Sequence, residues 1–442
     1  MNRLNSLEES AAAQFSIRRT SDAGATCPVT ALGAGFNPFT APFIADPYAF
    51  LARARREEPV FYSPEIDHWV VTRYEDVRDV FQNHTLFSAA NTLSAVTPMS
   101  PRVLQVLRDN NFRMNPVLTN LDPPEHVRIR RHAVNAFNTR HVAESEPWIR
   151  DHVNHFIDSL LARAPGSDGL RHADMVGEFA YDLPAHVAFR FLGVPDEEVA
   201  NVKSWTRNRV MLTWGRCDES TQLREVDGLL AMWKFCETHV ARLMQGEHQS
   251  FLGDLIRYHR ENPQDLSVNE IESILFTMLV AGHETTTNAL SNAFVTLLGE
   301  RSHWERLVHD PQLIAGAVEE LLRYRPPVIS WRRIAAADAV LGGQSIPKGG
   351  RLLLMIASAN HDPEQFPEPE RFDPLRANAR RNMTFGHGVH LCIGAGLARL
   401  EMKVVFEQLT QRLPGLQMDQ PQQFDYLPNL SFRGPTRILV RW

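Results

Sequence analysis

The chain has 442 residues, of which 43% are hydrophobic and 22% charged, so it has an ordinary globular composition and the length of one large or two average domains. A formal net charge of −6 argues against a general nucleic-acid-binding protein. No apolar run approaches the ~18 residues of a membrane span, and the four scattered cysteines suit a reducing cytosol better than a disulfide framework.

The first elements of the chain are short. Residues 1–35 are polar, rich in Ala, Ser and Thr, and lack the core of a signal peptide, so we expect a flexible tail followed by one domain over residues 36–442. A short helix is expected from Asp46, and a hairpin from residues 61–62 and 69–71. Another helix follows around Val77, and prolines make residues 89–118 less regular.

The segment Asp122-Pro123-Pro124-Glu125-His126 predicts a helix start, with Asp122 as the N-cap and proline in the first turn. His126 and Arg130 are four residues apart and therefore share one helix face. Further basic residues crowd the same helix, so a solvated basic face is the plain alternative. From there to about residue 258 the pattern is mostly helical, with a break at residues 192–198.

Ser267 and Glu270 form a capping-box pattern, and apolar spacing predicts one long helix from there to about residue 298. Its middle, residues 281–287, is small and hydroxylated, and Gly282 costs a helix about 1 kcal/mol relative to alanine. This suggests that a flat body with polar chemistry packs there. The alternative is that the threonines hydrogen-bond to helix carbonyls.

Glycines surround Cys392 in the stretch Phe385-Gly386-His387-Gly388-Val389-His390-Leu391-Cys392-Ile393-Gly394-Ala395-Gly396. Helical spacing resumes at Leu397, so the cysteine precedes a helix N-terminus, where amide N–H groups favour a thiolate. This indicates a rigid, soft metal ligand. A buried structural cysteine, a zinc site with the two histidines of this stretch, and a dinucleotide fingerprint are the alternatives.

The pattern Phe385-x-x-Gly388-x-His390-x-Cys392-x-Gly394 resembles the haem-binding loop of the cytochrome P450 superfamily. The resemblance covers residues 36–442, with five motifs in the expected order. It implies a mainly α fold with small β-sheets (α+β), in which a long central helix lies over haem b. In this family Cys392 would be the axial iron ligand, and the cofactor would also contact His126, Arg130, Arg333, Phe385, His390 and Gly394, with Arg332 as an alternative to Arg333.

The same resemblance assigns catalytic roles to Thr285, which would hydrogen-bond the oxygen that the haem activates, and to Glu284, which would feed protons. Glu320, Arg323 and Arg371 would form a structural triad. From motif position the substrate pocket would contain Met278, Ala281, Ile329, Ser330 and Leu430. The segment around Trp205 and Trp214 would cap the pocket, or its tryptophans pack in the core.

The implied activity is a monooxygenase that inserts one oxygen atom from O2 into a small or medium hydrophobic or aromatic substrate, by hydroxylation or O- or N-dealkylation. Electrons would come from NAD(P)H through a ferredoxin-type or FMN/iron–sulfur reductase, whose acidic surface would dock on Arg128, Arg131, Arg399 and Lys403. A cytoplasmic bacterial protein without membrane or nucleic-acid partners is expected. The rival functions are a peroxide-using haem peroxygenase or peroxidase and a non-catalytic haem sensor.

The C-terminal segments, with residues 60–65 and 213–216, are similar to a narrower group of P450s. That group contains stand-alone herbicide-degrading enzymes and self-sufficient fusions of a haem domain with a reductase. The sequence therefore predicts either a stand-alone enzyme or the haem domain of such a fusion.

Overall fold

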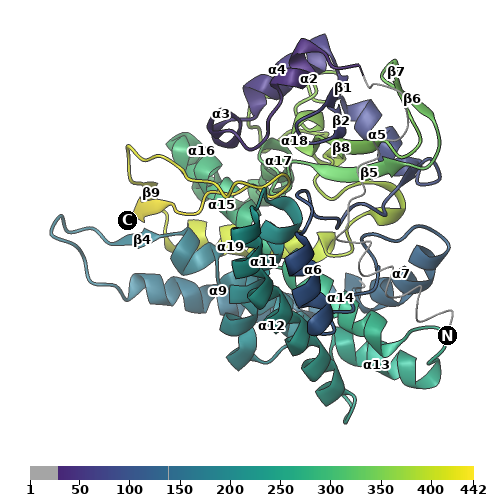
Figure 1. Cartoon of the computed structure of the whole chain (residues 1–442). Helices are drawn as coiled ribbons and strands as arrows, with labels where there is room; N and C mark the ends of the chain where they lie inside the picture. Colours follow the sequence, from purple (N-terminus) through teal and green to yellow (C-terminus); the bar gives the residue numbers. More distant parts are fainter. Residues whose placement is uncertain (1–27, 138) are drawn as a thin grey trace.

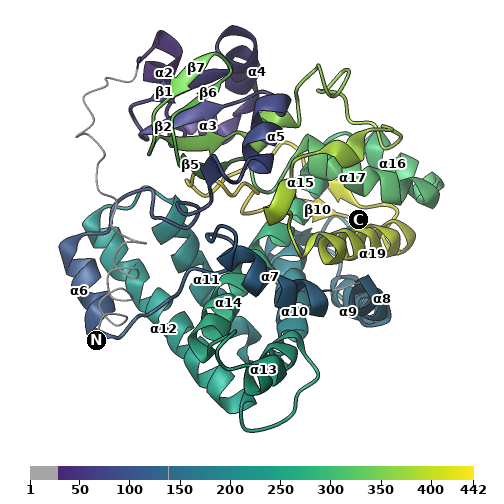
Figure 2. The ribbon, with the colours of Figure 1, turned by 90° about the vertical axis from the view of Figure 1, so that its right-hand side faces the viewer.

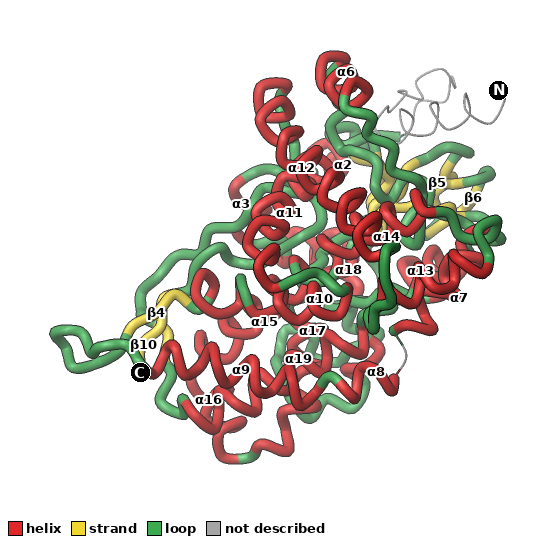
Figure 3. The backbone as a smooth tube through the Cα atoms, turned by 90° about the horizontal axis from the view of Figure 1, so that it is seen from below, coloured by secondary structure: helices red, strands yellow, loops and turns green. Residues whose placement is uncertain are grey.

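A helix-rich body and a smaller β-rich lobe make up the molecule (Figure 1). The computed structural model describes residues 28–137 and 139–442. The expected mainly α architecture with small sheets is confirmed. Figure 3 shows how far helices outweigh strands, which gather at two separate places in the molecule.

The β-rich lobe is built on a five-stranded sheet of order β1-β2-β8-β5-β3. β2 and β8 run parallel, and the other neighbours are antiparallel. The interior strand β2 is buried at every residue, as a strand covered on both faces requires. The strands of this sheet are β1 (Val60–Ser63), β2 (His68–Val71), β3 (Phe87–Ser88), β5 (Trp331–Ala335) and β8 (Arg351–Leu354).

The remaining strands form two smaller sheets. One has the order β4-β10-β9 and joins the C-terminal segment to the middle of the chain, and the other is a hairpin of β6 and β7. Their bounds are β4 (His172–Asp174), β6 (Ala339–Leu341), β7 (Gln344–Ile346), β9 (Gln417–Met418) and β10 (Leu439–Arg441).

Short helices accompany the β-rich lobe in Figures 1 and 2. These are α2 (Ala31–Gly35), α3 (Ala41–Ala45), α4 (Tyr48–Glu57), α5 (Tyr74–Gln82) and α18 (Ile356–Ala359). The helix α2 lies inside the segment that the sequence predicts as a tail. Thr30 caps it by accepting a hydrogen bond from the Gly33 amide (3.1 Å), and Leu32 is buried, so order begins before residue 36. Residues 1–27 lie outside the described residues.

The helical body surrounds α14 (Val268–Ala281) and α15 (Glu284–Gly299), which cross its middle in Figure 2. Around them lie α6 (Pro101–Asp109), α7 (Glu125–Ala136), α8 (Thr139–Glu144), α9 (Glu146–Leu161), α10 (Leu183–Leu192), α11 (Val199–Trp214), α12 (Glu219–Leu243), α13 (Phe251–Glu261), α16 (Arg301–His309), α17 (Ile314–Tyr324) and α19 (Ala395–Arg412). None of the helices in the described ranges is both long enough and apolar enough to span a membrane.

The prediction of one uninterrupted helix over residues 267–298 is wrong in its middle. The capping box of Ser267 and Glu270 is present as expected, but Gly282 and His283 separate α14 from α15. The ring Nδ1 of His283 lies 2.7 Å from the Leu279 carbonyl, the group that a regular helix would pair with the backbone amide of the same residue. This side-chain competition is the local reason for the break.

Candidate active site

The loop before α19 holds Cys392 in a fixed position. Gly386 and Gly388 both have φ of +70°, and a Cβ at Gly388 would come within 2.7 Å of the Phe81 carbonyl oxygen, so the close approach of α5 requires glycine there. The Cys392 amide donates to the Phe385 carbonyl (2.9 Å). The sulfur itself faces a cavity between this loop and the α14–α15 break.

The electrostatics at the sulfur are mixed. Burial raises the pKa of the Cys392 thiol, and this outweighs the amides of Gly394 and Ala395 and the charges of Arg130 and Arg399, all of which lower it. The helix-start environment that the sequence indicates is therefore present, but by itself it does not bring the pKa of the Cys392 thiol below its ordinary value. A thiolate here needs the further positive charge of a bound metal ion.

The zinc alternative is not supported by the arrangement of ligands. Across residues 28–137 and 139–442, no group of three or more His, Cys, Asp or Glu side chains is placed to hold a metal ion. His387 instead contacts the Gln82 side chain (2.9 Å), while His390 turns toward the Leu118 carbonyl. Neither histidine is therefore placed with Cys392 as part of a zinc-ligand set.

Polar donors without partners gather at one edge of the cavity. Both ring nitrogens of the fully buried His126 and Nε2 of His390 have no hydrogen-bond partner among the described residues, and the two rings lie 4.1 Å apart. Burial, followed by the charge of Arg130, lowers the pKa of His126 to about 4, so this histidine is a neutral donor near neutral pH. Arg130 lines the same cavity.

The second arginine at this edge is Arg333. It lines the cavity, and its guanidinium lies 5.1 Å from the centre of the Phe81 ring. Its neighbour Arg332 points to the opposite face of β5 and donates to the carbonyls of Thr92 (2.7 Å) and Ser94 (2.5 Å). The structure therefore resolves the choice between the two in favour of Arg333.

These residues fit a haem. Cys392 would hold the iron, and His126 with Arg130 and Arg333 supplies the donors that two buried propionates require. Phe385 and Gly394 also line the cavity, as the sequence predicts. Buried donors without partners are costly unless a ligand satisfies them.

Across the cavity from the cysteine, the α14–α15 break brings polar groups into an apolar wall. Met278, Ala281 and Thr285 line the cavity as predicted. The Thr285 hydroxyl donates to the Ala281 carbonyl (2.9 Å), so the hydrogen bond to the helix that the sequence offers as an alternative is formed. Glu284 turns toward α11, where it accepts from Thr206 (3.0 Å).

Three of the predicted pocket residues are placed elsewhere. Ile329 and Leu430 are buried in the core of the β-rich lobe, and the Ser330 hydroxyl donates to the Leu430 carbonyl (2.7 Å). The bridge between Val328 and Phe432 fixes this register, so the neighbouring residues face the cavity instead. The rest of the wall is mostly apolar and includes Leu118, Ala188, Leu192, Val328, Trp331 and Ile356.

The predicted triad is wrong in one member. Glu320 accepts from Arg323 Nε (2.7 Å) and from Arg376 Nε (2.9 Å), and the side chains of Glu320 and Arg323 are fully buried. The Arg371 side chain is 62% exposed and pairs with Glu368, while only its carbonyl meets the cluster. The loop of residues 367–376 turns back so that Arg376, five residues later, reaches the carboxylate.

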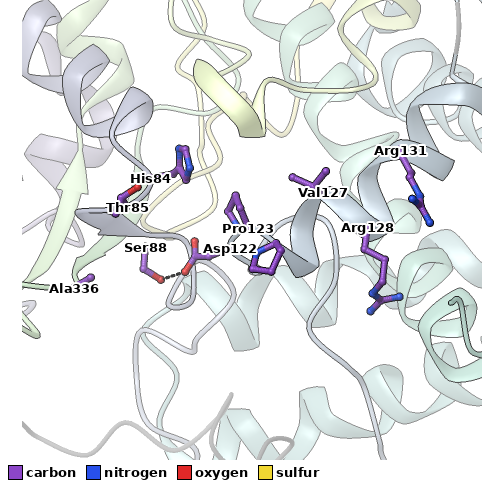
Figure 4. A pocket seen from close by; sticks show the side chains of 10 residues that line it. His84, Thr85, Ser88, Asp122, Pro123, Val127, Arg128, Arg131 and Ala336 are labelled. Atoms are coloured by element: carbon purple, nitrogen blue, oxygen red, sulfur yellow. Dashed lines mark hydrogen bonds between the residues drawn. The ribbon is translucent and has the colours of Figure 1, made fainter. Parts of the chain in front are cut away.

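A second hollow, open to solvent, lies beside the start of α7 (Figure 4). Asp122 accepts there from the Ser88 hydroxyl and the Ala89 amide (2.9 Å), so it ties β3 to α7 and does not cap the helix as predicted. Arg128 and Arg131 line this outer hollow, whereas Arg130 lines the main cavity and the buried His126 ring lies against the cavity-lining His390. The side chains of Arg131 and Arg128 are 55% and 27% exposed, so both reach solvent on this outer face of the helix.

Sequence reasoning missed several cavity residues. Trp331 stacks on Trp214 at 6.3 Å, and no motif marks it; Trp214 is buried, in line with the core-packing alternative. Glu401 on α19 is fully buried and lines the cavity, and its Oε1 has no partner among the described residues. Burial raises the pKa of Glu401 to about 8. The feature of the sequence that could have pointed to Glu401 is its position as an acidic residue within the helical pattern after Cys392.

Known proteins resemble this chain over most of its length. The family model described as cytochrome P450 matches residues 226–433. The cytochrome P450 monooxygenase PikC of Streptomyces venezuelae is 32% identical over 90% of this chain and 92% of its own. The solved CYP116B5 heme domain of Acinetobacter radioresistens is 34% identical, with a TM-score of 0.88 over 93% of this chain and 98% of that one. An intact type IV self-sufficient cytochrome P450 monooxygenase is 39% identical, with a TM-score of 0.89 over 96% of this chain and 54% of that one.

Proposed function

The chain belongs to the cytochrome P450 family of monooxygenases, and from this premise we propose that it inserts one oxygen atom from O2 into small or medium hydrophobic or aromatic substrates. Hydroxylation and O- or N-dealkylation are the proposed outcomes. The family binds haem and takes electrons from a redox partner. The finer proposal is an NAD(P)H-dependent flavin and iron–sulfur reductase, separate or fused, and a cytoplasmic location that rests on the scattered cysteines.

The observation that carries this proposal is that Cys392 and Thr285 line one cavity together with Arg130 and Arg333, with the unpaired ring of buried His126 against the cavity-lining His390. When bound through this cysteine, haem supplies O2 activation, which thiolate donation favours over reversible oxygen carriage. The chain itself holds the ligand, orients the propionates and excludes water with an apolar wall. Glu284 and Thr285 hold and pass protons at the α14–α15 break, which supports O2 rather than peroxide as the oxidant.

The substrate class rests on the wall of the cavity. Apart from Thr277, Thr285 and Thr286, the groups on the side of α14 and α15 and on the 327–331 segment are apolar, and Trp331 presents an aromatic surface. A flat compound with an alkoxy or N-alkyl substituent would bury apolar area there without leaving a buried charge unpaired. Screening alkoxybenzenes and N-alkyl anilines for shifts of the haem Soret band tests this class.

We place the redox partner on the face beside Leu391, which is 47% exposed next to the cysteine. The four predicted docking cations are ion-paired: Arg128 with Glu125 and Glu270, Arg131 with Asp265, Arg399 with Glu319, and Lys403 with Glu407. Pairing weakens long-range steering, so reduction by the partner should depend on ionic strength only moderately. Rates with no dependence on ionic strength would refute electrostatic docking on this face.

The deciding experiment is the spectrum of the reduced, haem-loaded protein under carbon monoxide. We expect the red-shifted absorption of a thiolate-ligated haem, and the Cys392→His variant as a matched control should give the imidazole-type spectrum. An imidazole-type spectrum from the unmodified chain would overturn the proposal. Turnover with peroxide but never with a reductase and O2 would replace it by the peroxygenase function.

A further inference from the structure

His283, at the break between α14 and α15, has one ring nitrogen whose role is fixed. Its side chain is fully buried, with the Phe189 ring packed edge-on at 5.2 Å. Nδ1 lies 2.7 Å from the Leu279 carbonyl oxygen. A carbonyl can only accept, so Nδ1 carries a hydrogen, and in a neutral imidazole Nε2 would then be a bare acceptor.

The surroundings of Nε2 contain too few hydrogens for that neutral state. Nε2 lies 3.4 Å from Glu284 Oε1 and 3.3 Å from Thr206 Oγ1, and the same hydroxyl lies 3.0 Å from Glu284 Oε1 and 2.8 Å from the Lys203 carbonyl. Thr206 has one hydroxyl hydrogen for these three acceptors. A neutral His283 beside an ionised Glu284 would therefore place two lone pairs against each other in a buried site.

One additional proton, on Nε2 or on Oε1, removes this conflict. We propose that His283 and Glu284 together hold one shared proton at rest, and that His283 is the positioning residue that keeps this proton next to the cavity for Glu284 and Thr285. This proposal rests on the proposed function for its purpose. When the pair gives up the proton to the cavity, a neutral imidazole and a carboxylate are left, and a proton from solvent restores the resting state.

The charges around the pair favour the ionised form of Glu284. Burial alone would raise the pKa of Glu284, but the contact with His283, the hydrogen bond from Thr206 and the charge of Lys203 lower it. The other ionisable groups that face this site lie on α11 and at the start of α10: Lys203, Arg207, Tyr181 and Asp182. Lys203 is 2% exposed, is ion-paired with Asp182 and lies 3.0 Å from the centre of the Tyr181 ring.

The path by which the proton returns is short. The Glu284 side chain is 16% exposed, and Asp182, at the outer end of the Lys203 ion pair, is 47% exposed. Water that reaches Asp182 is therefore separated from Glu284 only by Lys203 and Thr206. The pair is thus buried enough to exclude bulk water from the cavity and close enough to solvent to be recharged in each cycle.

Two substitutions separate a shared proton from a simple hydrogen bond. His283→Asn keeps an N–H at the position of Nδ1 for the Leu279 carbonyl but removes Nε2. His283→Gln keeps an N–H donor at the position of Nε2 for Glu284 but cannot titrate. Glu284→Gln removes the ionisable partner. Haem content and the carbon monoxide spectrum of each loaded variant, compared with those of the unmodified protein, show whether the variant folds with its cofactor.

The direct measurement is the protonation state of the pair in the haem-loaded, diamagnetic carbonyl form. Nuclear magnetic resonance of isotope-labelled histidine rings, assigned by comparison with His283→Asn, reports the imidazole, and infrared difference against Glu284→Gln reports the carboxyl. Near neutral pH we expect an imidazolium or a protonated carboxyl. A neutral imidazole together with an ionised carboxylate would overturn the proposal, whatever the enzyme's activity, so this failure is distinct from that of the proposed function.

The kinetic measurement is the fraction of NAD(P)H electrons recovered in product. In the unmodified enzyme this coupling should fall as alkaline pH removes the shared proton. In both His283 variants it should be lower by roughly tenfold and flat with pH, a smaller loss than the 10²–10⁴-fold effect of a whole acid group because Glu284 and Thr285 are retained. If His283→Gln couples as well as the unmodified enzyme across the pH range, His283 is only a hydrogen-bond donor and the proposal fails.

Discussion

Arg376→Met should destabilise the fold far more than Arg371→Met, although the sequence motif points to Arg371. Glu320 and Arg323 have no exposed side-chain surface, and the Arg376 side chain is 9% exposed with its Nε 2.9 Å from Glu320 Oε1. Removing Arg376 leaves a buried carboxylate with less positive charge around it and frees the carbonyls of Pro367 and Glu368. Methionine keeps most of the apolar stem, so the change is mainly electrostatic.

The expected loss of stability in Arg376→Met depends on the hydrogen bonds that Glu320 keeps in this variant. Breaking a buried ion pair costs about 3–5 kcal/mol. Because Arg323 still holds Glu320 through two hydrogen bonds of 2.7 and 2.8 Å, we expect the lower end, about 3 kcal/mol, for Arg376→Met. Arg371 and its partner Glu368 are 62% and 73% exposed, so Arg371→Met should cost less than about 1 kcal/mol.

Urea unfolding of the haem-loaded protein, followed by far-ultraviolet circular dichroism, measures this difference. In thermal unfolding the larger loss corresponds to a shift of roughly 3 °C, because a chain of this size loses about 1 °C of Tm per kcal/mol. The reduced carbonyl spectrum of each variant serves as the control for a filled cavity. Equal losses for the two variants, or a loss below about 1 kcal/mol for Arg376→Met, would refute the assignment of the cluster.

Four further substitutions have defined outcomes. Arg333→Leu should lower haem retention by roughly tenfold, the worth of one charge-assisted hydrogen bond of about 1.5 kcal/mol. Arg332→Leu, on the other face of β5, should weaken folding while the folded fraction keeps its haem, and haem titration of the two variants checks this difference. The pKa of Glu401 is raised from 4.5 to about 8, so the native state keeps a proton that the unfolded chain releases between these values. Stability should therefore fall as pH rises across this interval by up to about 1.4 kcal/mol per pH unit. Glu401→Gln should flatten this slope in urea unfolding at several pH values, and an unchanged slope would show that Glu401 titrates normally. Trp331→Ala should enlarge the cavity, so that bulkier alkoxybenzenes shift the Soret band at lower concentration than they do with the unmodified enzyme; an unchanged order of affinity would remove Trp331 from the substrate wall.

The features that could be predicted from sequence are those that neighbouring residues determine. The capping box of Ser267 and Glu270 needs only four residues, and the positive φ at Gly386 and Gly388 is carried by the glycines themselves. Cys392 could be singled out from the sequence because the ligand role that we propose for it needs this local geometry. The motif at His126 and Arg130 likewise lies within one helix turn, so both side chains reach the cavity edge together.

The errors concern choices between near neighbours that only tertiary contacts decide. Arg371 and Arg376 lie in one irregular loop, and its path decides which guanidinium reaches Glu320. The pocket prediction at Ile329 was wrong because the bridge of Val328 to Phe432 sets which residues face the cavity. The apolar spacing on both sides of Gly282 continues without a phase change, so the hydropathy pattern could not reveal the break that His283 produces.

Two buried polar clusters of the molecule differ in a way that locates the ligand. Around Glu320, every strong donor and acceptor has a partner within the chain, so that cluster stabilises the fold by itself. At the cavity edge, His126 and His390 leave three ring nitrogens unpaired, an arrangement that costs about 1–3 kcal/mol for each buried group. The network at the cavity edge is completed by an anion that accepts the one hydrogen of neutral His126, while Nε2 of His390 is a bare acceptor because Nδ1 of that ring donates to the Leu118 carbonyl. The propionates of a haem held by Cys392 meet this requirement, whereas a structural cysteine in an apolar core would leave the cost uncompensated.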